Sequence, residues 1–226
     1  MERVPTPELL DSDAGTPREI SDSLADLRMF NRWFGGTAVT SRLVKRVIRE
    51  TKSHSLSWLD VASGNGYVPH AVRDRLGQRV KISVTLLDRA PSHLRNGRDP
   101  VNGDGFVVGD ALALPFRDSS FDLVSSQLFV HHLSPNQVVH FAREGLRVCR
   151  RAFLINDLIR DPVHLALAYA GFPLYRSRIT RNDAPASVRQ AYTAGELLAL
   201  LRQVGDERVE IEFCYLYRMG VIVWKS

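Results

Sequence analysis

The sequence is poor in cysteine and lysine, and it contains no long hydrophobic run. Its two cysteines, Cys149 and Cys214, show neither CxxC nor Cys/His spacing, which argues against a disulfide framework and a zinc site. No apolar stretch approaches the roughly 20 residues of a membrane-spanning helix, and residues 1–13 are polar and acidic, unlike a signal peptide. We therefore expect a soluble, cytoplasmic protein without a membrane span.

Positive charge is present but not clustered. The net charge is +5 and the isoelectric point is near 9.5. The arginines are spread along the chain, and the densest group is Arg147, Arg150 and Arg151. A nucleic-acid partner selects clustered Lys and Arg, so this scatter favours solvated helix faces over a phosphate track. We expect a small-molecule partner, and the sequence leaves the oligomeric state open.

Capping signals at the start of the chain predict helices before the first strand. Thr16-Pro17-Arg18-Glu19 is a capping box with proline at the first helical position, and Gly35-Gly36 gives a stop, so residues 17–34 should be one helix. Apolar residues at helical spacing predict a second helix over 39–48. Two further capping boxes begin at Ser134 and Thr193.

From Ser57 onward, short apolar runs alternate with helical segments, which is typical of parallel βαβ units. With a length of 226 residues, we expect one domain with N-terminal cap helices over 1–52, a ligand-binding core over 53–159, a substrate-cover insertion over 160–192 and a closing helix with strands over 193–226. The predicted strands are Ser57–Val61, Ile82–Leu87, Phe106–Val108, Phe121–Ser126, Ala152–Ile155, and a closing pair within Val209–Tyr217 and Met219–Trp224.

A glycine-rich turn follows the first strand. Glycines at 64 and 66 let the backbone pass close to a ligand, and the following helix offers free N–H groups. Asp88 ends the second strand about 20 residues later, where a carboxylate can accept hydrogen bonds from ribose hydroxyls. Asp110 ends the third strand and can accept from an adenine amino group. The pattern predicts a nucleotide-like ligand at the carboxyl ends of the strands.

From about Ser57 to Ser226, this ordered set of motifs resembles the class I S-adenosylmethionine-dependent methyltransferases, in the small-molecule branch that includes quinone and polyketide methylases. The resemblance implies an α/β fold with a Rossmann-like, seven-stranded, mostly parallel sheet, helices on both faces and an antiparallel last strand. It implies S-adenosylmethionine as cofactor and S-adenosylhomocysteine as product. The cofactor-binding residues that it implies are Asp60, Ala62, Ser63, Gly64, Gly66, Asp88, Arg89, Gly109, Asp110, Ala111, Gln127, Leu128 and His132.

One departure and one competing interpretation bear on this resemblance. Ala62 stands where the family usually has glycine, and alanine is commonly tolerated there. A dinucleotide-binding reductase would have a small residue at the third motif position, where the helix packs on the strand, but Pro69 stands there. The sequence therefore favours a methyltransferase over an NAD-dependent reductase.

The resemblance also bears on the chemistry. Methyl transfer is an in-line displacement, so the protein mainly positions and desolvates the acceptor. The fourth strand ends in Ser125 and Ser126 instead of the aspartate that holds magnesium in catechol-type methylases, so we expect metal-independent transfer and no metal site. As candidate catalytic residues we name His131 and Asp157, which could remove a proton from the acceptor, with no dedicated base as the alternative.

Two added segments could cover the acceptor: the N-terminal helix and the insertion. Their aromatic side chains suit an apolar, phenolic, quinone-like or polyketide-like acceptor. A noncatalytic S-adenosylmethionine-binding partner protein and an RNA methyltransferase are the alternatives, and neither the acceptor nor the methylated atom follows from the sequence. The candidate substrate-binding residues are Trp33, Phe34, Phe129, His164, Tyr169, Tyr175 and Tyr192.

Overall fold

Seven strands form one sheet in the computed structural model, which describes residues 1–11, 15–77, 80–95, 104–214 and 216–226. The order is β3-β2-β1-β4-β5-β7-β6, and β7 runs antiparallel to both β5 and β6 while the remaining pairs are parallel. This confirms the predicted fold class. The strands are β1 (Ser55–Val61), β2 (Lys81–Asp88), β3 (Gly105–Val108), β4 (Phe121–Gln127), β5 (Cys149–Leu158), β6 (Val209–Cys214) and β7 (Arg218–Trp224).

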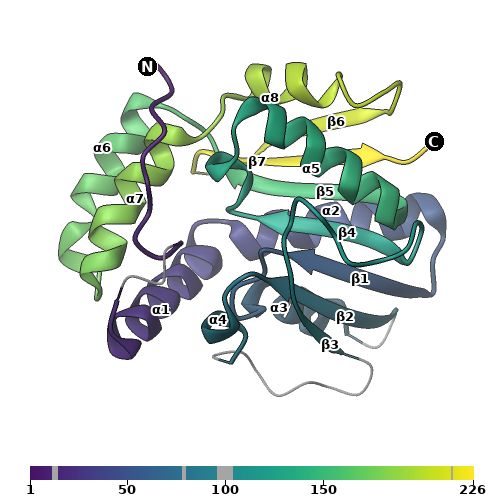
Figure 1. Cartoon of the computed structure of the whole chain (residues 1–226), viewed down its shortest axis with the longest axis horizontal. Coiled ribbons are helices and arrows are strands. Elements are labelled where there is room, and N and C mark those ends of the chain that lie inside the picture. Colours follow the sequence, from purple (N-terminus) through teal and green to yellow (C-terminus); the bar gives the residue numbers. More distant parts are fainter. Residues whose placement is uncertain (12–14, 78–79, 96–103, 215) are drawn as a thin grey trace.

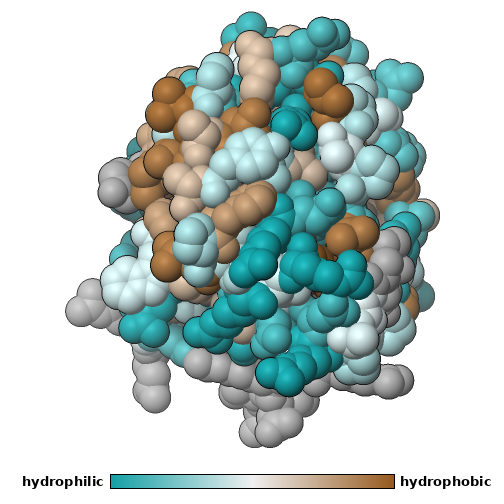
Figure 2. All heavy atoms as spheres, turned by 90° about the vertical axis from the view of Figure 1, so that its left-hand side faces the viewer, coloured by the Kyte–Doolittle hydropathy of each residue, from teal (hydrophilic) through white to brown (hydrophobic). Residues whose placement is uncertain are grey.

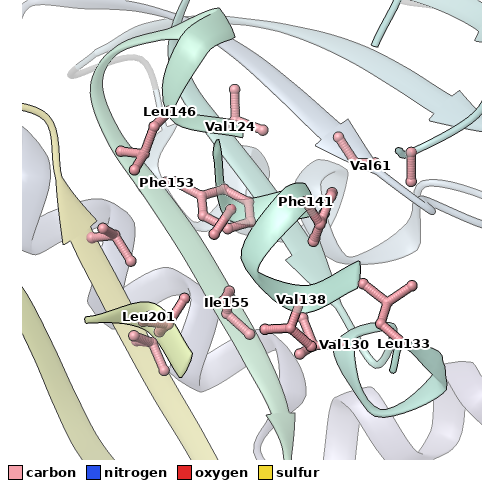
Figure 3. Close-up of a cluster of buried hydrophobic side chains, with 14 of the residues drawn as sticks. Val61, Val124, Val130, Leu133, Val138, Phe141, Leu146, Phe153, Ile155 and Leu201 are labelled. Atoms are coloured by element: carbon pink, nitrogen blue, oxygen red, sulfur yellow. The ribbon is translucent and has the colours of Figure 1, made fainter. Parts of the chain in front are cut away.

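Helices cover both faces of the sheet, because alternate residues of each buried strand point to opposite faces. On one face, α2 and α3 pack over Leu56, Trp58 and Val84. On the other, α5 and α8 pack over Val124 and Phe153 in the cluster drawn in Figure 3. The helices are α1 (Pro17–Trp33), α2 (Gly36–Thr51), α3 (Tyr67–Leu76), α4 (Pro91–Arg95), α5 (Pro135–Val148), α6 (Pro162–Ala170), α7 (Arg178–Gln190) and α8 (Ala194–Leu201), with short 3₁₀ turns η2 (Val130–His132) and η3 (Phe172–Leu174).

A helical cover lies at one side of the sheet. Figure 1 shows α1, α6 and α7 together on the left, with the N-terminal segment beside them. Ile20 and Leu24 of α1 pack on Ile179 of α7. Figure 2 faces this side and shows apolar side chains gathered over part of it, next to a hydrophilic band. The cover therefore joins the two segments that the sequence singled out.

The capping boxes are confirmed at Thr16, Ser134 and Thr193, each with both reciprocal hydrogen bonds. Most strand ends lie within one or two residues of their predicted positions. The exception is β5, which begins three residues before and ends three residues after the predicted Ala152–Ile155. At its end, Asn156 and Asp157 continue the ladder opposite Gly220 and Met219. No described helix is long and apolar enough to cross a membrane.

Removing the cap of α8 should measurably lower stability. The Thr193 hydroxyl accepts a hydrogen bond from the backbone N–H of Glu196, and the Glu196 carboxylate accepts one from the Thr193 N–H. We expect Thr193→Ala to lower the free energy of unfolding by about 1 kcal/mol, measured by urea denaturation. Thr193→Ser keeps the hydroxyl and is the matched control; equal losses in both variants would contradict a role for the cap.

Candidate functional site

A cavity of about 1000 Å³ lies between the carboxyl ends of the parallel strands and the helical cover. Its walls include the turn after β1, the ends of β2 and β3, and the segment after β4. The other side is formed by residues 8–11, α1, α6 and α7. Ligand pockets usually measure roughly 300–1,000 Å³, so this cavity has room for two molecules, such as a cofactor and an acceptor.

The turn after β1 requires unusual backbone angles. Gly64 and Gly66 have φ of +55° and +67°, and Ala62 adopts a φ of +54°, in the region that glycine tolerates best. A Cβ on Gly66 would lie 2.3 Å from Leu86 Cδ1, so only glycine fits there. Ala62, Ser63 and Gly64 line the cavity, whereas Gly66 lies behind them as the N-cap of α3.

Asp88 ends β2 and fixes that turn. One carboxylate oxygen accepts the Gly64 N–H at 2.7 Å, and the other accepts the Ala90 N–H at 2.9 Å. Burial alone would raise the pKa of Asp88, but the hydrogen bonds from His93 and these backbone groups lower it. An ionised carboxylate accepts up to four hydrogen bonds, so Asp88, which lines the cavity, can still accept from a ligand hydroxyl.

Asp60 is fully buried within β1 and does not line the cavity. One carboxylate oxygen accepts a hydrogen bond from the Ser125 hydroxyl, while Oδ2 has no partner among the described residues. Burial raises the pKa of Asp60 to about 7, against the opposing hydrogen bond from Ser125. An unsatisfied buried oxygen is costly, which indicates a group prepared to hold a polar or cationic neighbour.

The end of β3 supplies a more exposed part of the wall. Asp110 is exposed, and one of its carboxylate oxygens accepts the Leu112 N–H at 2.9 Å, which leaves the other oxygen for a ligand. Gly109 and Ala111 line the cavity on either side of it. Arg89, Gln127, Leu128 and His132 line it as well.

His131 and Asp157 lie together, as the sequence suggested. His131 Nδ1 is 2.6 Å from Asp157 Oδ1, and both side chains are buried. Burial alone would lower the pKa of His131, but Asp157 and Glu8 raise it to about 10. Because β5 continues past Asn156, Asp157 does not line the cavity, so this candidate catalytic residue reaches the site only through His131.

Five of the seven predicted substrate-binding residues line the cavity. Tyr169 and Tyr192 do not: the Tyr169 hydroxyl accepts a hydrogen bond from Arg189, and the Tyr192 hydroxyl donates to the Leu133 carbonyl oxygen. Trp33 is 67% exposed, which places it at the rim. The five predicted substrate-binding residues that line the cavity are Trp33, Phe34, Phe129, His164 and Tyr175.

Sequence reasoning missed the part of the wall that comes from residues 8–11. Glu8 and Asp11 line the cavity next to the histidines. It also missed Arg218, which is 2% exposed and whose guanidinium lies 3.4 Å from Asn156 Oδ1 and 3.3 Å from Asn31 Oδ1. No local pattern marks these residues, because each reaches the site only through packing of distant segments.

Comparison with known proteins points to one kind of enzyme. Residues 59–152 match the methyltransferase domain family. A ubiquinone/menaquinone biosynthesis C-methyltransferase of Stenotrophomonas maltophilia is 29% identical over 170 residues. That alignment covers 66% of this chain and 65% of the relative, so the chain spans slightly less than two thirds of the relative's length.

Solved structures share the fold. Human N-acetylserotonin methyltransferase in complex with S-adenosylmethionine aligns with a TM-score of 0.69 at 15% identity, covering 99% of this chain and 60% of that one. A methyltransferase from Aquifex aeolicus aligns with a TM-score of 0.58 at 17% identity, covering 80% and 89% of the two chains. At these identities the likeness establishes the fold alone. The alignment with the human enzyme extends over nearly the whole chain and therefore includes the helical cover.

Proposed function

We propose that this chain is a class I S-adenosylmethionine-dependent methyltransferase and that it transfers a methyl group from S-adenosylmethionine to a small organic acceptor bound in the same cavity. S-adenosylhomocysteine is the second product. The observation that carries the proposal is the hydrogen bond between the Gly64 N–H and Asp88. It brings a carboxylate and the exposed backbone of the Ala62–Gly64 turn together on one wall of the cavity.

The residues on this wall fit the methyl donor. The acceptor capacity left on Asp88 suits a ribose hydroxyl, and the open carboxylate oxygen of Asp110 suits the adenine amino group. The unpartnered Oδ2 of Asp60, behind the turn, suits the positive α-ammonium of the methionine end through a water molecule or through its charge alone. The ribose, the adenine amino group and the α-ammonium group are each matched in this way.

The protein's own part in the reaction is positioning and exclusion of water. S-adenosylmethionine supplies the electrophilic methyl group, so the chain needs to hold the acceptor in line with it. The N-terminal segment, α1, α6 and α7 line the remaining volume, where they can limit the access of solvent. Of the predicted cap segment 1–52, α2 packs on the sheet instead. We propose that residues 1–34 and 160–192 act as this cover, 53–159 as the cofactor-binding core, and 193–226 as the closing unit of a single domain.

The acceptor is proposed to be apolar or phenolic, such as a quinone precursor or a polyketide. Phe30 and Tyr175 meet edge to face in the cover, with ring centroids 5.4 Å apart, and both line the cavity. Aromatic walls of this kind favour flat, apolar ligands. The named activities of the quinone-biosynthesis relative and the human enzyme, each on a small molecule, support the same class.

Proton removal by His131 and Asp157 stays a prediction. With a pKa raised to about 10, the His131 ring is an imidazolium at neutral pH, held between Asp157 and Glu8. An imidazolium has no lone pair to accept a proton, so a base role would first require loss of that proton. The arrangement therefore supports a structural role for His131, as a charged group that holds Asp157 and Glu8 in place, better than a role as a general base.

A noncatalytic binding protein would need only the cofactor part of this cavity. The volume beyond the Asp88 wall, bounded by aromatic side chains, favours an enzyme instead. The experiment is incubation with radiolabelled S-adenosylmethionine and a panel of phenols, quinones and RNA, followed by chromatography of the products. Label in a phenol or quinone supports the proposal, and label in RNA alone would overturn its acceptor class.

The affinity for S-adenosylmethionine should rise with pH. Below about pH 7 the Asp60 carboxyl is mostly neutral, and above it the carboxylate attracts the α-ammonium group. We expect Kd to fall roughly tenfold between pH 5.5 and 7.5, measured by calorimetry. The range ends below pH 8 because a free α-amino group itself loses its proton there.

Asp60→Asn provides the test of this cause. An amide at this position carries no charge at either pH, so its Kd should be nearly flat across the range and weaker than wild type at pH 7.5. The explanation fails if the variant shows the same pH dependence as the wild-type protein.

A further inference from the structure

Three side chains on the cavity wall bring metal-binding atoms together. Glu8, His131 and His132 each offer one ligand atom, and these atoms all lie within 4.8 Å of one another. His131 Nε2 is 3.5 Å from Glu8 Oε1, and His132 Nε2 is 3.9 Å from Glu8 Oε2. A separation of 3.9 Å is too long for a hydrogen bond. Ligand atoms bound at about 2.0–2.1 Å to one ion lie about 3–4 Å apart, and both His–Glu8 distances fall in this range, so the three side chains need only a small adjustment to meet around one ion.

Each histidine is oriented by a separate carboxylate. His131 Nδ1 is 2.6 Å from Asp157 Oδ1, and His132 Nδ1 is 2.7 Å from Asp11 Oδ2. Both rings therefore turn their Nε2 atoms toward Glu8. Histidines that bind metal commonly donate their other ring N–H to a carboxylate, which fixes the tautomer and the ring orientation.

Glu8 is held in place from the opposite side. Its Oε1 accepts hydrogen bonds from Ser187 Oγ at 2.6 Å and Gln190 Nε2 at 2.7 Å, both on α7. These bonds leave Oε2 free to ligate an ion. The Glu8 side chain is only 9% exposed, so the carboxylate is fixed before any ion arrives.

The charges also favour a cation. Glu8, Asp11 and Asp157 surround the two rings with three carboxylates. Three carboxylates around two imidazole rings attract a cation to this largely buried place.

We propose that Glu8, His131 and His132 form a binding site for one divalent transition-metal ion. Two imidazoles and one carboxylate select zinc, iron, cobalt or nickel over magnesium and calcium, which prefer all-oxygen sites. Three protein ligands leave a position that opens to the cavity, where water or an acceptor oxygen can bind. The sequence-based expectation of no metal site rested on the spacing of the two cysteines and on the end of β4, and it did not include Glu8.

Such an ion would fasten the N-terminal segment across the cavity. The two residues after Glu8 are already bound to α7, because the backbone N–H groups of Leu9 and Leu10 donate to the Asp183 carboxylate. Binding of the ion to Glu8 and to the loop after β4 would link that segment to the sheet as well as to α7. Hydrogen exchange at residues 4–10 should therefore slow when the ion binds.

The test uses the untagged full chain, freed of metal with a chelator and titrated with Co²⁺ at pH 8 without S-adenosylmethionine. We expect one Co²⁺ per chain, with visible d–d absorption, no thiolate band from the cysteines, and displacement by Zn²⁺. Glu8→Ala and His132→Ala should weaken binding at least tenfold, and Asp11→Asn by roughly tenfold. Glu2→Ala, an exposed glutamate of the same segment, is the matched control and should bind as wild type.

The proposal is overturned if wild type binds no stoichiometric metal, or if the Glu8 and His132 variants bind as tightly as Glu2→Ala. Thermal melting shows whether each variant is folded. If Glu8→Ala is not folded, Glu8→Gln replaces it in the titration. Because metal binding is read without the methyl donor, a failure here leaves the proposed methyl transfer untouched, and a failure of methyl transfer leaves this result standing.

Discussion

Asp88→Ala is expected to weaken the binding of S-adenosylmethionine by about 1.5–3 kcal/mol, which corresponds to roughly a 10- to 150-fold rise in Kd. The variant loses charged hydrogen bonds to the ribose. It also frees the Gly64 and Ala90 N–H groups that hold the turn in shape. Calorimetry with S-adenosylmethionine and with S-adenosylhomocysteine measures the effect on both ligands.

The control for this prediction is Asp206→Ala, which removes an exposed aspartate outside the cavity wall. Its Kd should equal that of wild type. Thermal melting shows whether Asp88→Ala remains folded. An Asp88→Ala protein that binds the methyl donor within about twofold of wild type would mean that the ribose lies elsewhere.

Deletion of residues 1–34 is expected to abolish turnover while the sheet still folds. The deletion removes Leu24, Leu27 and Phe30 from the cavity wall, so the acceptor loses its alignment and water reaches the methyl group. Misplacement by about an ångström can cost roughly 100-fold in rate, and loss of the cover should cost at least that. Single-turnover transfer from labelled S-adenosylmethionine measures it.

The truncated chain keeps the hydrophobic core of the sheet, so we expect it to fold. Val39, Leu43 and Val47 of α2 still cover one face of the sheet, so a cooperative thermal transition should remain. Phe30→Ala should raise the KM for the acceptor, whereas Phe213→Ala, an aromatic residue 73% exposed on β6, should not. Full activity in the truncated protein would refute the N-terminal part of the cover.

The part of the site that local sequence could predict is the cofactor wall. The glycine turn, Asp88 and Asp110 each follow directly from a strand end, and parallel strands bring their carboxyl ends to one edge. Residues at the carboxyl ends of adjacent strands therefore lie close together, and this follows from the strand order alone, without information on the packing of distant segments. The three capping boxes were predictable for the same reason, because all of their hydrogen bonds lie within four residues.

The opposite wall could not be predicted in this way. Glu8 and Asp11 sit in a polar N-terminal stretch with no periodicity, and their place is set by hydrogen bonds to α7 and to the loop after β4. The extension of β5 was missed because Asn156 and Asp157 are polar, which is unusual for a buried strand. Both are satisfied by tertiary partners, Asn156 by the Gly36 carbonyl oxygen and Asp157 by His131.

The most direct test of the central claim is calorimetric titration of the wild-type protein with S-adenosylmethionine and, separately, with NADH. The match of residues 59–152 to the methyltransferase domain family and the position of Asp88 on the cavity wall predict saturable binding of S-adenosylmethionine with one site per chain. Pro69 in α3, where a dinucleotide-binding helix needs a small residue, predicts no response to NADH. Micromolar binding of NADH without any response to S-adenosylmethionine would contradict the account.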